Sequence, residues 1–357
     1  MKCILITGAG GPAAINFTMS LKIAPEKIHL VGTETSHHNV CLAPTDSIHI
    51  VPKATEPDYV GALNAIIQKE KVEFVHPQPD IEVKVISENR EKLEAKVLLP
   101  AKHAIRTCQD KLQSVKSWLK TEVPTAKTME LLRESDIEKA LRQLGTPLWI
   151  RARYGAGGCG STLASNKETA LSWIQYWKAR GERWEFIAQE YLRGRNIGFH
   201  SLWKDGELIT SMARERIEYI YPHIAPSGIT GTPAVQKTIH NEKANEIATE
   251  AVLAIDHSYN GIACVDLKEN DEGIPCVTEI NAGRMFTTSF FFSYAGKILY
   301  DNYLANIPYL YVKLAYKEVV SDTSKYNALP EELFWIRHID APAKLVRDGK
   351  VLGTMYT

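Results

Sequence analysis

Residues 151–161 read RARYGAGGCGS and contain the densest glycine cluster of the chain. Four glycines within six residues leave a backbone that can fold over a triphosphate and point its N–H groups at the phosphates. Arg151, directly before the loop, adds a permanent positive charge and several donors for phosphate oxygens. No Gly-Lys-Ser/Thr sequence follows, so this is not a Walker A loop. A flexible surface hairpin is the alternative, and the flanking Arg151 and Arg153 favour a phosphate-binding loop over it.

Further along the chain, two apolar strand-like segments are joined by a turn at residues 271–273. A hairpin would place Asp266 beside Glu279, and Asn281 leaves the same strand face as Glu279. Two carboxylates and an amide oxygen form a hard site that suits Mg²⁺ or Mn²⁺ with bound phosphate, and Arg284 adds a cation beside it. The alternative is an acidic surface hairpin, but polar groups among apolar neighbours need a partner.

A charged stretch between these two motifs carries Arg214 and Arg216, followed by His223. The two arginines are able to clamp a substrate carboxylate through bidentate hydrogen bonds. A solvated charged turn is an equally good interpretation of the same residues, and His223 fits the surface and a site equally well. Arg214, Arg216 and Arg284 are therefore candidate substrate contacts, with both interpretations open.

The first hundred residues alternate strand-like and helix-like segments, which predicts a parallel, doubly wound sheet. The first strand ends in a glycine turn at residues 8–11, which is able to bind a dinucleotide phosphate while Glu34 holds a ribose hydroxyl, as in an NAD-dependent epimerase or reductase. Pro12 lacks an N–H donor, which favours a tight turn that binds no nucleotide. The Tyr-x-x-x-Lys pair that such a reductase needs, Tyr309 and Lys313, lies in an apolar run typical of buried structure.

The second half combines short strands and tight turns with a long helix at residues 242–254, which indicates an α+β region with an antiparallel sheet. A length of 357 residues suits two or three domains. We expect an α/β Rossmann-like domain at residues 1–105, a smaller region with the glycine loop at 106–188, and a third with the metal site at 189–357.

Charge and composition narrow the class of protein. Lys plus Arg and Asp plus Glu each number 42, and this zero net charge predicts neither a nucleic-acid partner nor an anionic membrane. The chain contains no stretch of about 18 apolar residues, so we expect no membrane span. The six cysteines lie far apart without a C-x-x-C pair, which argues against a zinc knuckle and favours a reducing, cytoplasmic location.

Taken together and in this order, the motifs resemble the ATP-grasp superfamily, especially a single module of the carbamoyl phosphate synthase large subunit and related carboxylate–amine ligases. The resemblance covers nearly the whole chain and implies an ATP-grasp fold with an N-terminal Rossmann-like, pre-ATP-grasp domain. It implies an ADP-forming ligase that activates an amino acid or small carboxylate as an acyl phosphate and transfers it to an amine. ATP and Mg²⁺ would be the cofactors, the partners would be small-molecule substrates, and dimers are common among such relatives.

The resemblance also assigns roles to individual residues. Lys111 and Arg151 would contact the nucleotide phosphates, and Arg284 would steady the transferring phosphoryl group. The lid over the triphosphate would comprise Gly155, Gly157, Gly158, Gly160 and Ser161. The hinge strand whose backbone reads adenine would comprise Gln189, Glu190, Tyr191 and Leu192. The metal ligands would be Asp266, Glu279 and Asn281.

One departure from the family pattern concerns the ribose. The family usually has a glutamate soon after the hinge glycine, and here Asn196 stands in that stretch. This departure admits a catalytically degenerate module that binds ATP only for regulation. The complete set of Asp266, Glu279 and Asn281 argues against that alternative, because a module that only binds has little need of three aligned metal ligands.

Overall fold

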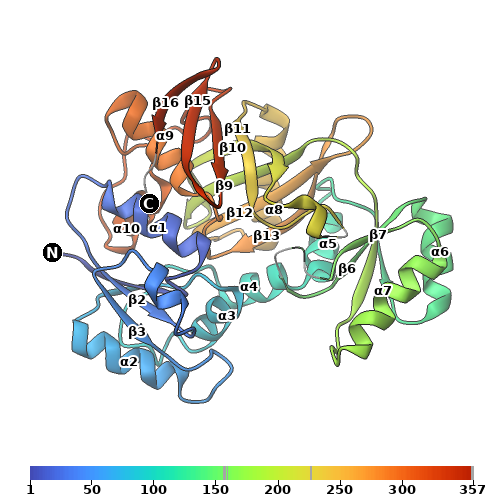
Figure 1. Ribbon diagram of the computed structural model, residues 1–357, viewed down its shortest axis with the longest axis horizontal. Coiled ribbons are helices and arrows are strands. Elements are labelled where there is room, and N and C mark those ends of the chain that lie inside the picture. Colours follow the sequence, from blue (N-terminus) through green and yellow to red (C-terminus); the bar gives the residue numbers. More distant parts are fainter. Residues whose placement is uncertain (156–157, 159, 226, 355–357) are drawn as a thin grey trace.

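The computed structural model describes residues 1–354 except 156, 157, 159 and 226. Within these residues the strands form three sheets, one of eight strands and two of four. The N-terminal sheet and the large sheet lie against each other, whereas the small sheet with its two helices stands apart from them (Figure 1). None of the helices in the described residues combines the length and hydrophobicity required to span a bilayer.

The N-terminal sheet is parallel and has the strand order β3-β2-β1-β4. Every residue of β1 is buried, as expected for a parallel strand covered on both faces. This arrangement confirms the predicted α/β organisation. The elements are β1 (Cys3–Thr7), α1 (Pro12–Lys22), β2 (His29–Glu34), η1 (Asn39–Leu42), β3 (Ser47–Ile50), α2 (Tyr59–Glu70), β4 (Phe74–His76) and α3 (Asp80–Glu88).

Two short helices, α4 (Lys102–Gln109) and α5 (Lys111–Lys120), lead to the small antiparallel sheet. Asp110 lies between them and begins α5, because its carboxylate accepts hydrogen bonds from the N–H groups of Leu112 and Gln113. The small sheet has the order β5-β8-β6-β7 and its own apolar core. Its elements are β5 (Thr128–Leu131), α6 (Glu134–Leu144), β6 (Leu148–Ala152), β7 (Thr162–Ala164), α7 (Lys167–Ala179) and β8 (Phe186–Glu190).

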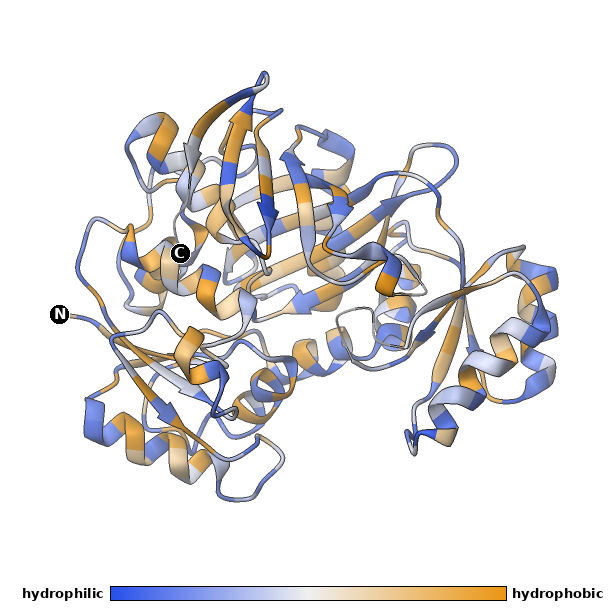
Figure 2. Cartoon of the chain, viewed as in Figure 1, coloured by the Kyte–Doolittle hydropathy of each residue, from blue (hydrophilic) through white to orange (hydrophobic). Residues whose placement is uncertain are grey.

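The large sheet is antiparallel, with the order β13-β12-β9-β10-β11-β14-β15-β16. Its elements are β9 (Asn196–Lys204), β10 (Glu207–Tyr219), η2 (Pro222–Ile224), β11 (Pro233–Thr238), α8 (Glu242–Ile255), β12 (Gly261–Glu269), β13 (Pro275–Ala282), α9 (Phe290–Tyr300), α10 (Ile307–Ala315), β14 (Phe334–His338), β15 (Ala341–Arg347) and β16 (Lys350–Thr354). Apolar residues are concentrated along its strands, and hydrophilic residues predominate in the turns (Figure 2).

Both faces of the large sheet are covered in its middle. Along β12, Val265 and Leu267 belong to the apolar cluster that contains α8, whereas Cys264 belongs to the cluster that contains α9 and α10. Successive side chains of a strand point to opposite faces, so Asp266 continues the face of Cys264. The candidate site therefore lies on the sheet face that α9 and α10 cover farther along.

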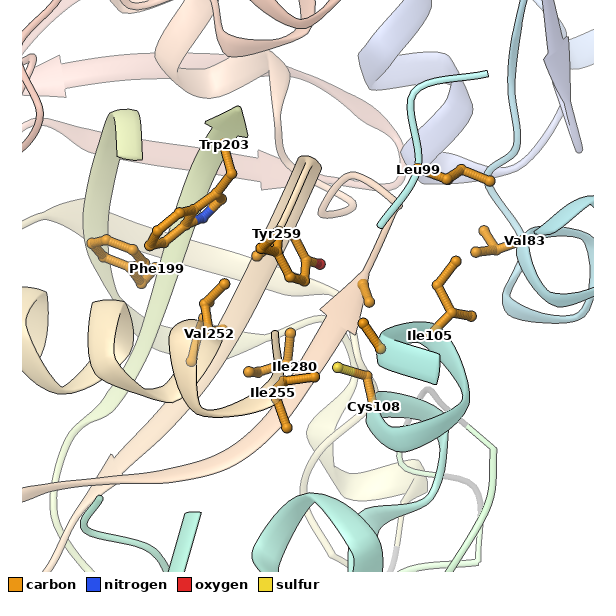
Figure 3. Packing of buried hydrophobic residues seen from close by; sticks show 14 of the residues in the cluster. Val83, Leu99, Ile105, Cys108, Phe199, Trp203, Val252, Ile255, Tyr259 and Ile280 are labelled. Atoms are coloured by element: carbon orange, nitrogen blue, oxygen red, sulfur yellow. The ribbon is translucent and has the colours of Figure 1, made fainter. Parts of the chain in front are cut away.

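One core joins the N-terminal sheet to the large sheet. Val83 of α3 and Leu99 belong to the same cluster as Ile105 of α4 and Ile280 of β13 (Figure 3). The small sheet has a separate cluster. The N-terminal part is thus packed as one body with the large sheet, and it contributes directly to the site described below.

Candidate active site

A cavity of about 410 Å³ lies between the small sheet and the large sheet. This volume is within the range of small-molecule sites. Its first side carries Trp149, Gln189, Glu190, Tyr191 and Leu192. Its second side carries Asp266, Glu279, Asn281 and Arg284. Its third side carries Arg214, Arg216, Ile229, Pro233, Phe286 and Thr287.

The three predicted metal ligands lie together on the second side. Asp266 of β12 and Glu279 of β13 are directly paired across the two strands, and the amide of Asn281 donates to Asp266 Oδ2 at 3.2 Å. The hairpin sets this register, because the Asn270 side chain accepts the N–H groups of Glu272 and Ile274 in the turn.

These side chains fit a hard divalent cation. Both carboxylates and the amide line the same cavity, and oxygen donors of this kind suit Mg²⁺ that keeps waters and phosphate oxygens as its other ligands. A carboxylate has about four acceptor sites, so one hydrogen bond from an arginine leaves capacity for a metal. Among the described residues, no group of three His, Cys, Asp or Glu side chains offers an alternative metal site.

Cations surround Glu279. The Arg151 guanidinium donates to Glu279 Oε2 at 2.5 Å, and Lys111 Nζ lies 3.7 Å from Oε1. Burial alone would raise the pKa of Glu279, but Lys111, Arg151 and Arg284 outweigh burial and hold the pKa at about 2. Burial lowers the pKa of Lys111, and Glu279 partly offsets this effect. Glu279 is therefore ionised at neutral pH and available to a metal.

Asp266 is held by Arg216, which donates to its Oδ1 at 2.5 Å. The guanidinium of Arg216 lies over Gly198, where an added Cβ would be 3.0 Å from Arg216 Nη2. Arg284 pairs with Asp80 at the start of α3 and donates to Asn281 Oδ1. The N-terminal sheet thus reaches the second side of the cavity through Asp80.

The glycine loop lies at the edge of this cavity. Gly158 and Ser161 line it, and Ser161 Oγ donates to the carbonyl of Gly158 at 2.5 Å. Gly158 has φ +74°, and a Cβ there would lie 2.7 Å from the Ile229 carbonyl oxygen, so the position requires glycine. Lys111 donates to the carbonyl of Gly155. Gly160 is buried under Trp184, and the predicted lid residue Gly157 lies outside the described residues.

All four predicted hinge residues line the first side of the cavity. Gln189 is buried and donates to Thr128 Oγ1 at 2.9 Å, and Glu190 accepts the N–H of Lys127 at 2.8 Å. The ring of Tyr191 faces Lys268, whose Nζ lies 5.1 Å from the ring centroid. Asn196 lines the same side and donates to Tyr219 at 3.1 Å.

The cavity carries a net positive charge. Among its described lining residues, five are cations (Arg151, Arg214, Arg216, Lys268 and Arg284) and three are carboxylates (Glu190, Asp266 and Glu279). A lining with this surplus favours an anionic ligand such as a triphosphate. Lys268 is not among the candidate site residues predicted from the sequence. Its position two residues after Asp266 on β12 places it on the same strand face, which could have indicated it.

Two open interpretations of the sequence are settled by geometry. Arg214 and Arg216 lie on β10, Arg214 is buried and the side chain of Arg216 is 9% exposed, so the solvated turn is wrong for them. His223 is exposed in η2 and does not line the cavity. Trp149 and Phe286 were also missed, because isolated aromatic residues in apolar stretches are usually core.

The N-terminal glycine turn is occupied by the protein itself. Glu34 is buried and accepts the N–H of Gly10 at 3.1 Å and that of Thr35 at 2.9 Å. A Cβ on Gly10 would collide with the backbone of Asn39 at 2.2 Å. A carboxylate already occupies the N–H group that a phosphate would need, so this geometry argues against the dinucleotide site. Tyr309 is buried and donates to Glu26, as expected for structural residues.

Comparison with known families and structures agrees with this geometry. Residues 4–99 match the PylC-like, N-terminal domain, and residues 110–286 match the ATP binding domain of the carbamoyl-phosphate synthase L chain. Curated protein sequences include none that matches the chain.

Three solved structures illustrate the similarity of fold. Carboxyaminoimidazole ribonucleotide synthase from Aspergillus clavatus, complexed with ATP, has a TM-score of 0.70 at 15% identity over 94% of this chain and 81% of that one. The biotin carboxylase domain of Hydrogenobacter thermophilus 2-oxoglutarate carboxylase, a dimer with MgADP, ADP and bicarbonate, has a TM-score of 0.68 at 15% identity over 94% and 73%. The L-amino acid ligase from Bacillus licheniformis has a TM-score of 0.67 at 14% identity over 94% and 79%. At these identities the likeness confirms the predicted fold.

Proposed function

The chain belongs to the ATP-grasp family of ATP-dependent carboxylate–amine ligases, and on this premise we propose that it activates an amino acid or a related small carboxylate as an acyl phosphate. An amine then receives the acyl group, and ADP and phosphate are released. The observation that carries the proposal is the second side of the cavity. Asp266, Glu279 and Asn281 meet there with Arg151 and Arg284, next to the glycine loop and the hinge.

The nucleotide would extend from the hinge to the metal ligands. Trp149 and Tyr191 lie on the side where adenine would bind, with ring centroids 6.4 Å apart. Lys268 and Asn196 would face the ribose and the first phosphates in place of the usual glutamate. Lys111, Arg151 and the glycine loop would bind the outer phosphates, because their donors converge beside Glu279.

The residues of the second side would organise phosphoryl transfer. Asp266, Glu279 and Asn281 would hold Mg²⁺, which supplies a Lewis acid to the phosphate oxygens when it is bound. Arg284, fixed by Asp80 and Asn281, would stabilise the charge that develops on the transferring group. The substrate carboxylate attacks the γ-phosphorus and ADP leaves, after which the amine attacks the acyl carbon and phosphate leaves. Positioning and electrostatics carry most of the rate in such a reaction.

Other parts of the sequence interpretation stay predictions. We propose that residues 1–105, 106–188 and 189–357 act as the pre-ATP-grasp domain, the small subdomain and the C-terminal subdomain. Their three sheets are compatible with this division. A homodimer and a cytoplasmic location are likewise expectations from the sequence and the family.

ADP release with Mg·ATP and paired pools of amino acids tests the function. We expect release to require two partners and to fall by about 100-fold or more in Glu279→Ala, because the loss of one preorganised electrostatic group typically costs that much. Glu272→Ala, an exposed change in the turn of the same hairpin, is the matched control and should retain activity.

Three results would contradict the proposal. Full activity in Glu279→Ala would refute the metal assignment. Tight Mg·ATP binding without ADP release under any pool of acids and amines would favour the regulatory module. Binding of NAD without binding of ATP would favour the reductase.

A further inference from the structure

The third side of the cavity contains a buried arginine without an anionic partner. Arg214 is 1% exposed and lines the cavity. Within the described residues its Nε and Nη1 atoms have no hydrogen-bond partner, and no carboxylate lies within salt-bridge distance of it. Its guanidinium carbon lies 4.3 Å from the ring centroid of Phe286 and 5.5 Å from that of Phe292.

The charged groups that act on Arg214 include two further arginines and one carboxylate, Asp266. Burial, together with the neighbouring Arg216 and Arg337, lowers the pKa of Arg214 to about 9, although Asp266 opposes this shift. Burial also lowers the pKa of His200 to about 3, so this neighbour is a neutral imidazole. A buried charge is costly unless it is paired. An anionic group of a ligand would provide the missing pair.

Neighbouring strands add further donors behind this side of the cavity. Gln236 of β11 is directly paired with Arg216 of β10 and with Trp335 of β14, and its amide Nε2 has no partner in the described part of the chain. Arg337, two residues after Trp335, donates to the carbonyls of Pro233 at 2.7 Å and Thr287 at 3.1 Å. Pro233 and Thr287 line the cavity, so Arg337 fixes two segments of its wall from behind.

The register of the sheet gives the distance between this arginine and the metal ligands. Arg214 is paired with Gly198, Gly198 with Asp266, and Asp266 with Glu279, so these four residues form one row across four strands. Two strand spacings separate Arg214 from Asp266, which is about 10 Å between their Cα atoms. The guanidinium of Arg216 lies over Gly198 between them, and Arg214, Arg216 and Asp266 all line the cavity. A small molecule that binds Arg214 in this cavity therefore lies beside the region of phosphoryl transfer.

We propose that Arg214 binds a substrate carboxylate that does not react, and that this carboxylate belongs to the amine-bearing partner, which is accordingly an amino acid. The inference rests on the proposed ligase function. The carboxylate that is phosphorylated belongs beside Asp266, Glu279 and Arg284, so Arg214 is left for a second, spectator anion. The guanidinium, close to the rings of Phe286 and Phe292, matches a planar carboxylate, which two parallel hydrogen bonds satisfy.

The experiment compares amino acids with their carboxamides as the amine partner. Alanine and alaninamide are a suitable first pair, with the full chain, Mg·ATP and pools of activating carboxylates. Wild type should prefer the free carboxylate by about 10- to 100-fold in KM, the range expected for hydrogen bonds to a charged group. Arg214→Gln should remove this preference by raising the KM of the amino acid, with the Kd of Mg·ATP unchanged.

Two further variants make the result specific. Arg214→Lys retains a charge and should restore part of the preference. Lys237→Gln changes a cation on β11 that pairs with Glu332 on the opposite strand face from Gln236, and it should behave as wild type. Thermal unfolding of each variant monitors folding, and Arg214→Gln should not lower Tm by the amount typical of a broken ion pair, because no partner is left behind.

A binding readout separates this inference from the proposed function. Alanine should raise the Tm of wild type but not that of Arg214→Gln, and alaninamide should raise neither. This outcome without ADP release would support the subsite and refute the ligase. ADP release that is indifferent to the carboxylate of the amine partner would refute the subsite and leave the ligase intact. If the KM preference depends on a second carboxylate of the activated acid and not on that of the amine partner, the assignment to the amine partner is wrong. If Arg214→Gln weakens Mg·ATP binding as much as it weakens amino-acid binding, the arginine belongs to the nucleotide site.

Discussion

At the residue scale, Gly198 is the position on which the contact between Arg216 and Asp266 depends. The guanidinium of Arg216 lies flat over this glycine on its way to the carboxylate, and an added Cβ would lie 3.0 Å from Nη2 and 3.3 Å from Cζ. The backbone of Gly198 is not in the left-handed region, so a side chain would cause no backbone strain. The lack of a side chain at this position is therefore required by the contact between Arg216 and Asp266 and not by the backbone conformation of the strand.

We therefore expect Gly198→Ala to fold but to displace Arg216 from Asp266. Turnover should fall by about 10-fold or more, because misplacement of site groups by a fraction of an ångström to an ångström is costly. Steady-state ADP release and thermal unfolding measured together would check this. Gly61→Ala is the control, since Gly61 is exposed in α2 with nothing near its Cβ position, and the change should add up to about 1 kcal/mol of stability. Unchanged turnover in Gly198→Ala would show that the Arg216–Asp266 contact has no catalytic role.

At the element scale, Asp110 connects α5 to the strand that precedes the glycine loop. Its carboxylate accepts the N–H groups of Leu112 and Gln113 at the start of the helix, and it also pairs with Arg153 at 2.6 Å. Burial would raise the pKa of Asp110, but Arg153 and the backbone donors outweigh burial and lower it. Asp110 thus begins the helix that positions Lys111, and it also pairs with Arg153, the residue that follows β6.

Two substitutions separate the roles of Asp110. Asp110→Asn keeps a good helix cap and loses the ion pair, whereas Asp110→Ala loses both, so Ala should be less stable than Asn by about 1 kcal/mol. Both should weaken Mg·ATP binding, because among the described residues Arg153 would remain paired with Glu130 and Glu185, away from α5. Chemical unfolding and ATP titration measure the two effects. Equal stability of the two variants would mean that the cap contributes nothing.

At the scale of the whole molecule, the N-terminal sheet contributes to the site, although the Glu34 carboxylate occupies its glycine turn. It shares a core with α4, α8 and β13 (Figure 3). Gln78 exchanges hydrogen bonds with the backbone of Met285, and Asp80 pairs with Arg284. These contacts place the start of α3 against the segment that carries the candidate catalytic arginine.

Asp80→Asn should therefore lower kcat by about 10-fold while it changes the Kd of Mg·ATP by less than about 2-fold, because a misplaced Arg284 acts on the transferring group and not on the bound nucleotide. Asp58→Asn, an exposed change before α2, is the control. Equal losses of binding and turnover, or no loss at all, would show that Asp80 does not position Arg284.

The sequence alone determined those features that depend on neighbours along the chain. The buried strand β1, the helix α2 and the turn at Asn270–Gly273 follow from local patterns of apolar residues, glycine and asparagine. The convergence of Asp266, Glu279 and Asn281 also followed, because a short turn and the two-residue period of a strand leave little choice of face.

Only the tertiary structure decided which charged side chains pair with each other and which residues form the third side of the cavity. Arg151 and Glu279 are separated by 128 residues, and Arg284 follows β13 and Asp80 begins α3, so no local pattern predicts these pairs. The sequence around Arg214 fits a solvated turn or a buried strand, and its burial depends on Phe286 and on Phe292 of α9, which come much later in the chain. Burial and electrostatic pairing depend on which segments meet in space, and that is set by the packing of the whole chain.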